Sequence, residues 1–155
     1  MLRLHDTLSG DLVDFVPREE GRVAMYVCGP TVYDAPHLGH ARSALVFDVI
    51  RRYLMWRGFD VTFAMNVTDI DDKIIARAAK EATTEPALAA VWERVYFDQM
   101  ETLDVLPADH RPRATEYIDG MTRLIAELVE RDAAYVIEGS GVYFDVESFE
   151  GPVRE

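Results

Sequence analysis

Residues 23–40 read VAMYVCGPTVYDAPHLGH, and this stretch decides the fold that we expect. Its first part, residues 23–28, is a nearly continuous apolar run that stops at a Gly-Pro pair. Such a run is typical of a strand that is buried on both faces of a parallel sheet. A turn-rich segment then leads into residues 38–57, which we predict to form one long helix that stops before Gly58.

A second apolar strand follows this helix at residues 61–65 and completes a strand–helix–strand unit. The helix carries apolar residues at spacings of 4, 4 and 3, which predict its buried stripe: Leu45, Val49, Tyr53 and Trp56. Parallel strands joined by a helix are the building unit of α/β proteins. The sequence therefore predicts an α/β fold with a parallel sheet and flanking helices.

Periodicity and turn residues predict shorter elements around this unit. We expect Thr68 to cap a helix that runs to about residue 82, with Asp71 completing a variant of the capping box. The other expected elements are a hairpin within residues 2–16, helices at 85–100 and 115–131, a loop at 107–112, and strands at 134–137 and 142–146.

Composition excludes several classes of protein. The 155 residues suit about one domain, and 49% of them are hydrophobic. The formal charge is 16 − 28 = −12, which argues against non-specific nucleic-acid binding. Four arginines lie close together in the first predicted helix and form either a local basic patch or a solvated face: Arg42, Arg51, Arg52 and Arg57. With one cysteine and no apolar run of about 18 residues, we expect a cytoplasmic protein outside the membrane.

The pattern His37-Leu38-Gly39-His40 opens the first predicted helix. Its two histidines are three residues apart, so both lie on one face of the first turn. A helix N-terminus that follows a buried strand presents free N–H groups and a positive dipole to an anion. The pattern therefore indicates either a nucleotide triphosphate site or a capped helix with exposed histidines.

Cys28 stands at the carboxyl end of the first predicted strand, beside the same crevice. A lone free cysteine is most often a small buried hydrophobe. Two other roles stay open: a metal site shared with Asp34, His37 and His40, which lacks a standard ligand spacing, and a nucleophile with a histidine base.

Three carboxylates follow the second predicted strand, namely Asp69, Asp71 and Asp72. Helix capping explains acidic residues in a first turn. The same residues also allow a Mg²⁺ site, although the pattern does not require one.

Several segments together resemble cysteinyl-tRNA synthetases: YVCGPTVYD at 26–34, HLGH at 37–40, NVTDIDDK at 66–73, PRAT at 112–115 and VYFDV at 142–146. The H-x-G-H pattern matches the signature of class I aminoacyl-tRNA synthetases, and the preceding cysteine narrows the family. The resemblance covers nearly the whole chain and implies a truncated, Rossmann-like class I synthetase nucleotide-binding fold. It divides the chain into an N-terminal hairpin extension (1–20), the first half of the catalytic domain (21–112), and a helix with short strands leading into a connective insertion (113–155).

The resemblance also implies roles for particular residues. ATP, with Mg²⁺, would be held by His37, Gly39 and His40, and the two histidines would be catalytic. L-Cysteine would be activated to cysteinyl-adenylate and passed to tRNA(Cys). Cys28 would be one ligand of a zinc ion that selects the substrate thiol, and the cysteine pocket would be lined by Cys28, Gly29, Thr31 and Thr68.

Some features of the resembled family are missing from the sequence. Its other zinc ligands and its K-M-S-K-S loop lie further along those chains and have no counterpart here. We therefore expect an N-terminal fragment, monomeric, with weak or absent zinc binding and no complete aminoacylation. Two alternatives stay open: a ligase that joins cysteine to an amino-sugar inositol in mycothiol synthesis, and a non-catalytic nucleotide-binding module.

Overall fold

The structure is a computed structural model that describes residues 2–148. The chain forms two units, of which residues 17–116 are the larger. Residues up to 16 and from 117 onward form the other. No helix among the described residues is both long and apolar enough to cross a membrane.

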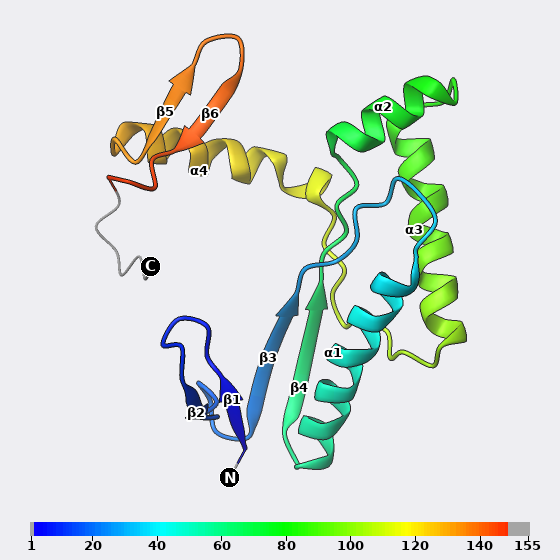
Figure 1. Cartoon of the computed structure of the whole chain (residues 1–155), viewed down its shortest axis with the longest axis vertical. Helices are drawn as coiled ribbons and strands as arrows, with labels where there is room; N and C mark the ends of the chain where they lie inside the picture. Colours follow the sequence, from blue (N-terminus) through cyan, green and yellow to red (C-terminus); the bar gives the residue numbers. More distant parts are fainter. Residues whose placement is uncertain (1, 149–155) are drawn as a thin grey trace. The chain divides into compact units, whose positions relative to one another are not determined.

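A strand–helix–strand unit forms the centre of the larger unit, as predicted. The strands β3 (Arg22–Val27) and β4 (Asp60–Met65) pair in parallel, with Val27 opposite Met65 at their carboxyl ends. Helix α1 (Leu38–Trp56) connects them and runs alongside β4 (Figure 1). Gly58 follows the helix with a φ of 90°, a left-handed conformation in which glycine is favoured. The predicted helix stop is therefore confirmed.

Only one face of this sheet is covered among the described residues. Val27, Phe63 and Met65 are buried and belong to the core, whereas Tyr26 is 62% exposed. The expectation of a strand buried on both faces is therefore wrong for β3. An apolar run reports hydrophobicity on both faces, but burial also requires an element that covers each face, and α1 covers one.

The apolar stripe predicted for α1 is also wrong. All four of its members are exposed, Trp56 by 78%: Leu45, Val49, Tyr53 and Trp56. The buried positions are instead Ala44, Asp48, Arg51 and Leu54.

Ion pairs explain why two charged residues of α1 are buried. The Arg51 guanidinium donates to both carboxylate oxygens of Asp109 at 3.1 and 2.9 Å, and to the carbonyl of Pro107 at 2.7 Å. Asp48 accepts the backbone N–H of Leu106 at 3.0 Å and the Nε–H of Arg52 at 2.6 Å. Buried charges are tolerated where they are paired and hydrogen-bonded. Apart from Arg52, these partners lie more than 50 residues away in the sequence.

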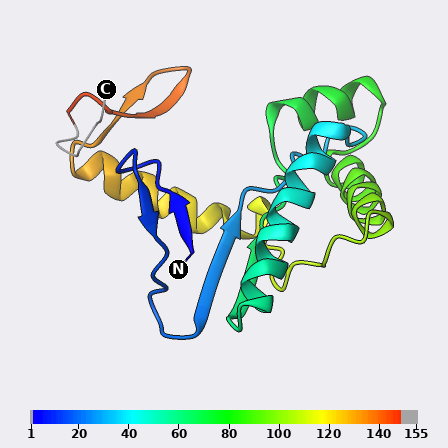
Figure 2. The same cartoon turned by 60° about the horizontal axis from the view of Figure 1, so that its bottom comes forward.

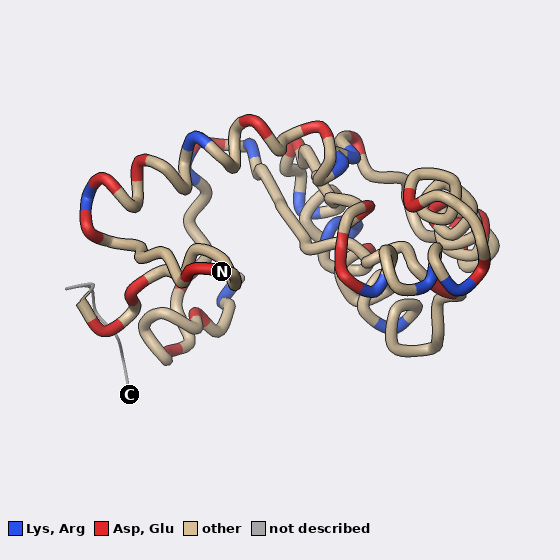
Figure 3. Tube along the Cα trace, turned by 90° about the horizontal axis from the view of Figure 1, so that it is seen from above, with Lys and Arg blue, Asp and Glu red and all other residues tan. Residues whose placement is uncertain are grey.

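These contacts also bear on the cluster of arginines. Arg51 and Arg52 are both held by carboxylates, and the Arg57 guanidinium lies 5.8 Å from the centre of the Tyr53 ring. Figure 3 shows Lys and Arg interspersed with Asp and Glu along the larger unit. The described contacts therefore favour a mixed-charge helix face over a basic patch.

Two further helices complete this unit: α2 (Asp72–Lys80) and α3 (Glu85–Thr102). Helix α2 lies beyond the carboxyl ends of the strands (Figures 1 and 2). Its N-cap is Asp71, so the predicted start at Thr68 is wrong by three residues. Thr68 lies before the helix and pairs with the extended chain that follows β3, because its N–H donates to the carbonyl of Pro30 at 3.0 Å.

The other unit contains two antiparallel hairpins and a helix. The predicted hairpin is confirmed as β1 (Arg3–His5) with β2 (Leu12–Asp14). The strands predicted at 134–137 and 142–146 are β5 (Ala134–Ile137) and β6 (Gly141–Phe144), which form a second antiparallel hairpin, and β6 ends two residues earlier than predicted. The helix predicted at 115–131 precedes β5 in the chain. It opens as a 3₁₀ turn, Ala114–Tyr117, and continues as α4, Ile118–Glu130. The domain boundaries drawn at residues 20 and 112 stay predictions, and the last seven residues lie outside the described part.

Candidate functional site

The chain segments that leave β3 and β4 stay side by side beyond the sheet. Thr31 and Thr68 form a parallel bridge, in which the N–H of Val32 donates to the carbonyl of Thr68 at 3.2 Å. Ligands of open α/β sheets bind at the carboxyl ends of the strands. The fold therefore places the two threonines that the sequence assigned to one pocket next to each other at this end.

Gly29 is fixed by a residue that the sequence reasoning did not assign to the site. Its N–H donates to the side-chain oxygen Oδ1 of Asn66 at 2.8 Å, and the Asn66 amide donates to Thr68 Oγ1 at 3.3 Å. A Cβ at position 29 would lie 1.6 Å from the backbone carbonyl oxygen of Asn66. Glycine is thus required where the two segments touch. The position of Asn66, directly after an apolar strand, was the signal that could have found it.

The two histidines of the H-x-G-H pattern cap α1 together. His37 is the N-cap residue, and its Nδ1 accepts the N–H of Gly39 at 3.1 Å. The Nδ1 of His40 accepts the N–H of His37, also at 3.1 Å. The ring centres are 4.1 Å apart. This reciprocal arrangement is a capping box in which imidazoles replace the usual hydroxyl and carboxyl groups.

Gly39 has a steric reason within the chain itself. A Cβ at this position would lie 2.8 and 2.9 Å from the Cε1 and Nδ1 atoms of the His37 ring. The family resemblance assigned this glycine to the ATP site. The structure shows that it already clears space for the His37 ring, which folds back over the first turn.

The capping bonds determine which nitrogens face a ligand. A nitrogen that accepts a hydrogen bond carries no proton, so each neutral ring carries its proton on Nε2. Burial lowers the pKa of His40, and the neighbouring His37 lowers that pKa further. His40 is therefore neutral at pH 7, and both rings keep an Nε2–H group for a ligand at the helix N-terminus.

The nearby carboxylates have structural partners. Asp34 accepts the N–H of Ala35 and forms an ion pair with Arg77, and these contacts, led by the Ala35 bond, lower the pKa of Asp34. The Asp69 carboxylate accepts the N–H of Thr115 at 3.0 Å. Asp71 caps α2 through the N–H of Lys73, and Asp72 lies in the first turn of that helix. Capping therefore accounts for Asp71 without a Mg²⁺ ion.

The Cys28 thiol is exposed, so the expectation of a small buried hydrophobe does not apply. Within residues 2–148, no group of three or more His, Cys, Asp or Glu side chains could hold a metal ion. A structural zinc site needs four ligands and a catalytic one three. The described residues therefore do not form a zinc site by themselves.

Zinc binding by the isolated chain is expected to be weak. With Cys28 as its one cysteine, the chain should show no stoichiometric, high-affinity Zn²⁺ binding in a titration at pH 7. A Cys28→Ser variant serves as the control and should give the same titration. A tight 1:1 isotherm that disappears in this variant would contradict the expectation.

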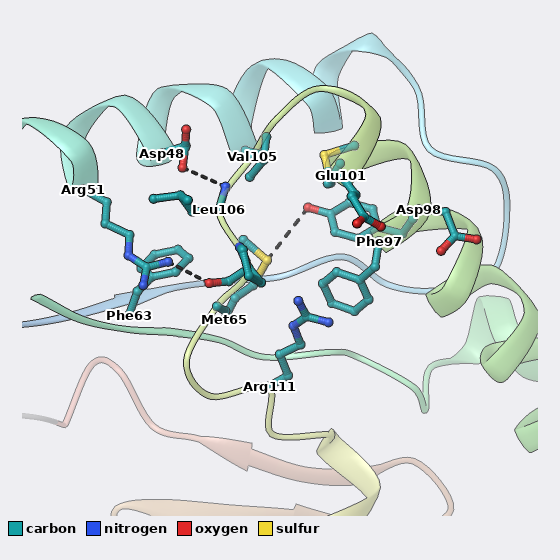
Figure 4. Close-up of a pocket in the computed structure, with 15 residues that line it drawn as sticks. Asp48, Arg51, Phe63, Met65, Phe97, Asp98, Glu101, Val105, Leu106 and Arg111 are labelled. Atoms are coloured by element: carbon teal, nitrogen blue, oxygen red, sulfur yellow. Dashed lines mark hydrogen bonds between the residues drawn. The ribbon is translucent and has the colours of Figure 1, made fainter.

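A cavity of about 290 Å³ lies among α1, β4, α3 and the loop that follows α3 (Figure 4). Its lining includes Asp48 and Arg51 from α1, Phe97 from α3, and Arg111. None of the residues that the sequence assigned to the site lines it. Its lining does include Met65, the last residue of β4, and Tyr96 from α3.

Solved structures show the class of fold. The chain is similar to methionyl-tRNA synthetase from Mycobacterium tuberculosis in complex with methionyl-adenylate, with a TM-score of 0.66 and 22% identity over 74% of this chain and 23% of that one. A leucyl-tRNA synthetase from Agrobacterium radiobacter gives a TM-score of 0.65 and 20% identity over 79% and 16%. The fold is that of a class I aminoacyl-tRNA synthetase catalytic domain.

Sequence comparison narrows the class to one branch. The family model described as the catalytic domain of class I tRNA synthetases (C) matches residues 14–152, and the chain belongs to this family. Cysteine–tRNA ligases from Pyrococcus horikoshii and Halorhodospira halophila are 53% and 49% identical to it over 96% of its length. The chain spans 31% and 32% of those two proteins, about a third of their length.

Proposed function

We propose that the chain forms the ATP- and cysteine-binding part of a cysteine–tRNA ligase. The observation that carries the proposal is the pair of mutually capping histidines at the start of α1, each with an Nε2–H left for a ligand. A helix N-terminus carries the positive end of the helix dipole, which favours phosphate binding. Two imidazole donors and the positive end of the α1 dipole suit the triphosphate of ATP, whereas the N–H groups of Gly39 and His40 already donate to His37.

The proposed chemistry is adenylate formation. A carboxylate oxygen of cysteine attacks the α-phosphorus of ATP, the bond to the β-phosphate oxygen breaks, and pyrophosphate leaves with the electron pair. His37 and His40 donate hydrogen bonds from Nε2 to phosphate oxygens whose negative charge grows in the transition state. This is catalysis by positioning and electrostatic stabilisation, without a covalent enzyme intermediate. Mg²⁺ accompanies ATP as its counter-ion.

The cysteine pocket in this proposal lies beside the Thr31–Thr68 bridge. Cys28, Gly29, Thr31 and Thr68 line it, and Asn66 holds the two segments together. Zinc would have to draw its remaining ligands from outside the described residues, with the exposed thiol of Cys28 as the one supplied here.

The acceptor in this proposal is tRNA(Cys), and the complete enzyme works in the cytoplasm as a monomer. The relatives that are 50%, 53% and 49% identical to this chain are named cysteine–tRNA ligases. These names support tRNA as the acceptor rather than the amino sugar of mycothiol synthesis. For the isolated chain we propose nucleotide binding without turnover. Cysteine-dependent exchange of pyrophosphate into ATP, measured on the isolated chain, should be undetectable.

ATP binding tests the proposed site directly. His40→Ala removes one Nε2–H donor and the reciprocal cap, so the dissociation constant for Mg·ATP should rise about tenfold or more. Isothermal titration calorimetry measures this change. His5→Ala, which truncates an exposed histidine of β1, is the matched control and should bind like the wild type. Equal affinity of both variants, or no binding by the wild type, would refute the proposal.

A further inference from the structure

One residue outside the H-x-G-H pattern contacts His40 from another helix. Tyr96 lies in α3, is 5% exposed, and belongs to the main core cluster. Its ring is perpendicular to that of His40, with ring centres 6.4 Å apart. This distance falls in the range of favourable edge-to-face aromatic pairs. Contact with His40 therefore comes from a part of the chain that the sequence motif does not include.

Tyr96 is itself held firmly. Its hydroxyl contacts the Met65 sulfur at 3.8 Å (dashed line in Figure 4), and its ring meets that of Phe97 edge-on with centres 5.2 Å apart. Burial raises the pKa of Tyr96, so its hydroxyl keeps its proton at neutral pH. Met65 is the last residue of β4 and directly precedes Asn66. Tyr96 therefore links the end of β4 to the first turn of α1.

We propose that Tyr96 is a positioning residue for His40, a proposal that rests on the function proposed above. The Nδ1 of His40 must keep facing the His37 N–H if its Nε2–H is to be available to a phosphate. A surface imidazole turns easily about its side-chain bonds, and a fixed ring packed against it restricts this turning. Tyr96 would thus act on ATP through His40, without touching the nucleotide.

The groups that contact His40 are known from the described structure. His37 contacts it from the helix start and Tyr96 contacts it from α3. Cover by Tyr96 keeps water from part of the His40 ring, which disfavours its protonated form. Removal of the Tyr96 ring should therefore raise the pKa of His40, which can be measured without any ligand.

The test compares three substitutions in the full chain. Tyr96→Phe keeps the ring, whereas Tyr96→Leu and Tyr96→Met remove it and keep an apolar side chain of moderate size. The pKa of His40 is followed by NMR titration of its ring C–H signal, identified by its loss in His40→Gln. We expect the pKa to stay lowered in Tyr96→Phe and to rise toward the ordinary histidine value in both ring-free variants. Mg·ATP should bind about 2- to 10-fold more weakly to the ring-free variants.

The outcomes separate this proposal from the function on which it rests. A His40 pKa that is the same in wild type and in a folded ring-free variant would overturn the positioning role. Folding is checked by circular dichroism, and the milder Tyr96→Met keeps the test open where Tyr96→Leu unfolds. An increased His40 pKa in a chain that binds no ATP would support the contact but contradict the proposed function. Equal loss of ATP binding in Tyr96→Phe would also overturn the role of the ring.

Discussion

Replacing Gly29 by alanine should lower the free energy of unfolding by about 3 kcal/mol or more, or prevent folding altogether. The new Cβ would lie 1.6 Å from the Asn66 carbonyl oxygen and 2.8 Å from its carbon. Both are backbone atoms and cannot turn aside as a flexible side chain can. Relief would require separating the two segments that carry Thr31 and Thr68, so the candidate cysteine pocket should be lost as well. Urea denaturation followed by circular dichroism measures the change.

Gly120→Ala is the matched control for this experiment. Gly120 lies inside α4, and a Cβ there would meet one atom, the flexible end of Arg123, at 3.9 Å. Alanine is a better helix former than glycine by about 1 kcal/mol, so this variant should be as stable as the wild type or slightly more stable. If both variants unfold at the same urea concentration, the close approach at Gly29 is absent in solution.

Replacing Asp109 by alanine should cost about 2–3 kcal/mol of stability. Its carboxylate accepts two bonds from Arg51 and the backbone N–H of Phe63 at 2.7 Å. Without it, Arg51, which is 7% exposed, would keep its charge with one carbonyl partner, that of Pro107. Loss of one partner of a fully buried pair costs about 3–5 kcal/mol, and the partial exposure of Asp109 reduces this figure.

Asp104→Ala controls for the loss of a carboxylate. The Asp104 side chain is fully exposed, and its oxygen lies 3.9 Å from Arg52, so loss of this ion pair should have little effect. Asp104 has a φ of 57°, where alanine is less favoured than aspartate, so a small loss of stability from the backbone is expected. The Phe63 bond, with Arg51, lowers the pKa of Asp109 below 3.8. The stabilisation is therefore complete above that pH and is lost as the pH falls through the folded-state pKa. The urea midpoint should decrease on acidification in Asp104→Ala, which keeps the Asp109 carboxylate. The decrease should be smaller in Asp109→Ala, which lacks that carboxylate.

The sequence alone determined the order of elements and the position of the candidate site. Strand, helix and strand follow from local features: an apolar run, a helical period and a glycine stop. The H-x-G-H pattern marked the helix start correctly, because capping involves residues within three positions of one another. The motifs also led to the right family, which the family match confirms.

The tertiary structure alone decided which face of α1 is buried. Sequence periodicity favoured the face of Leu45 and Trp56, but the buried face includes Asp48 and Arg51, because their partners come from the segment after α3. The local sequence likewise favoured Thr68 as a helix cap. In the folded chain Thr68 instead pairs with the segment after β3 and lies beside Thr31.

The features from Cys28 to His40 divide in the same way. The sequence determined that two histidines and a glycine begin a helix. The folded chain decided that the histidines cap that helix with Nδ1, that Gly29 touches Asn66, and that Tyr96 covers His40. Capping is encoded by neighbouring residues, whereas burial and ring contacts depend on segments that meet only when the chain folds.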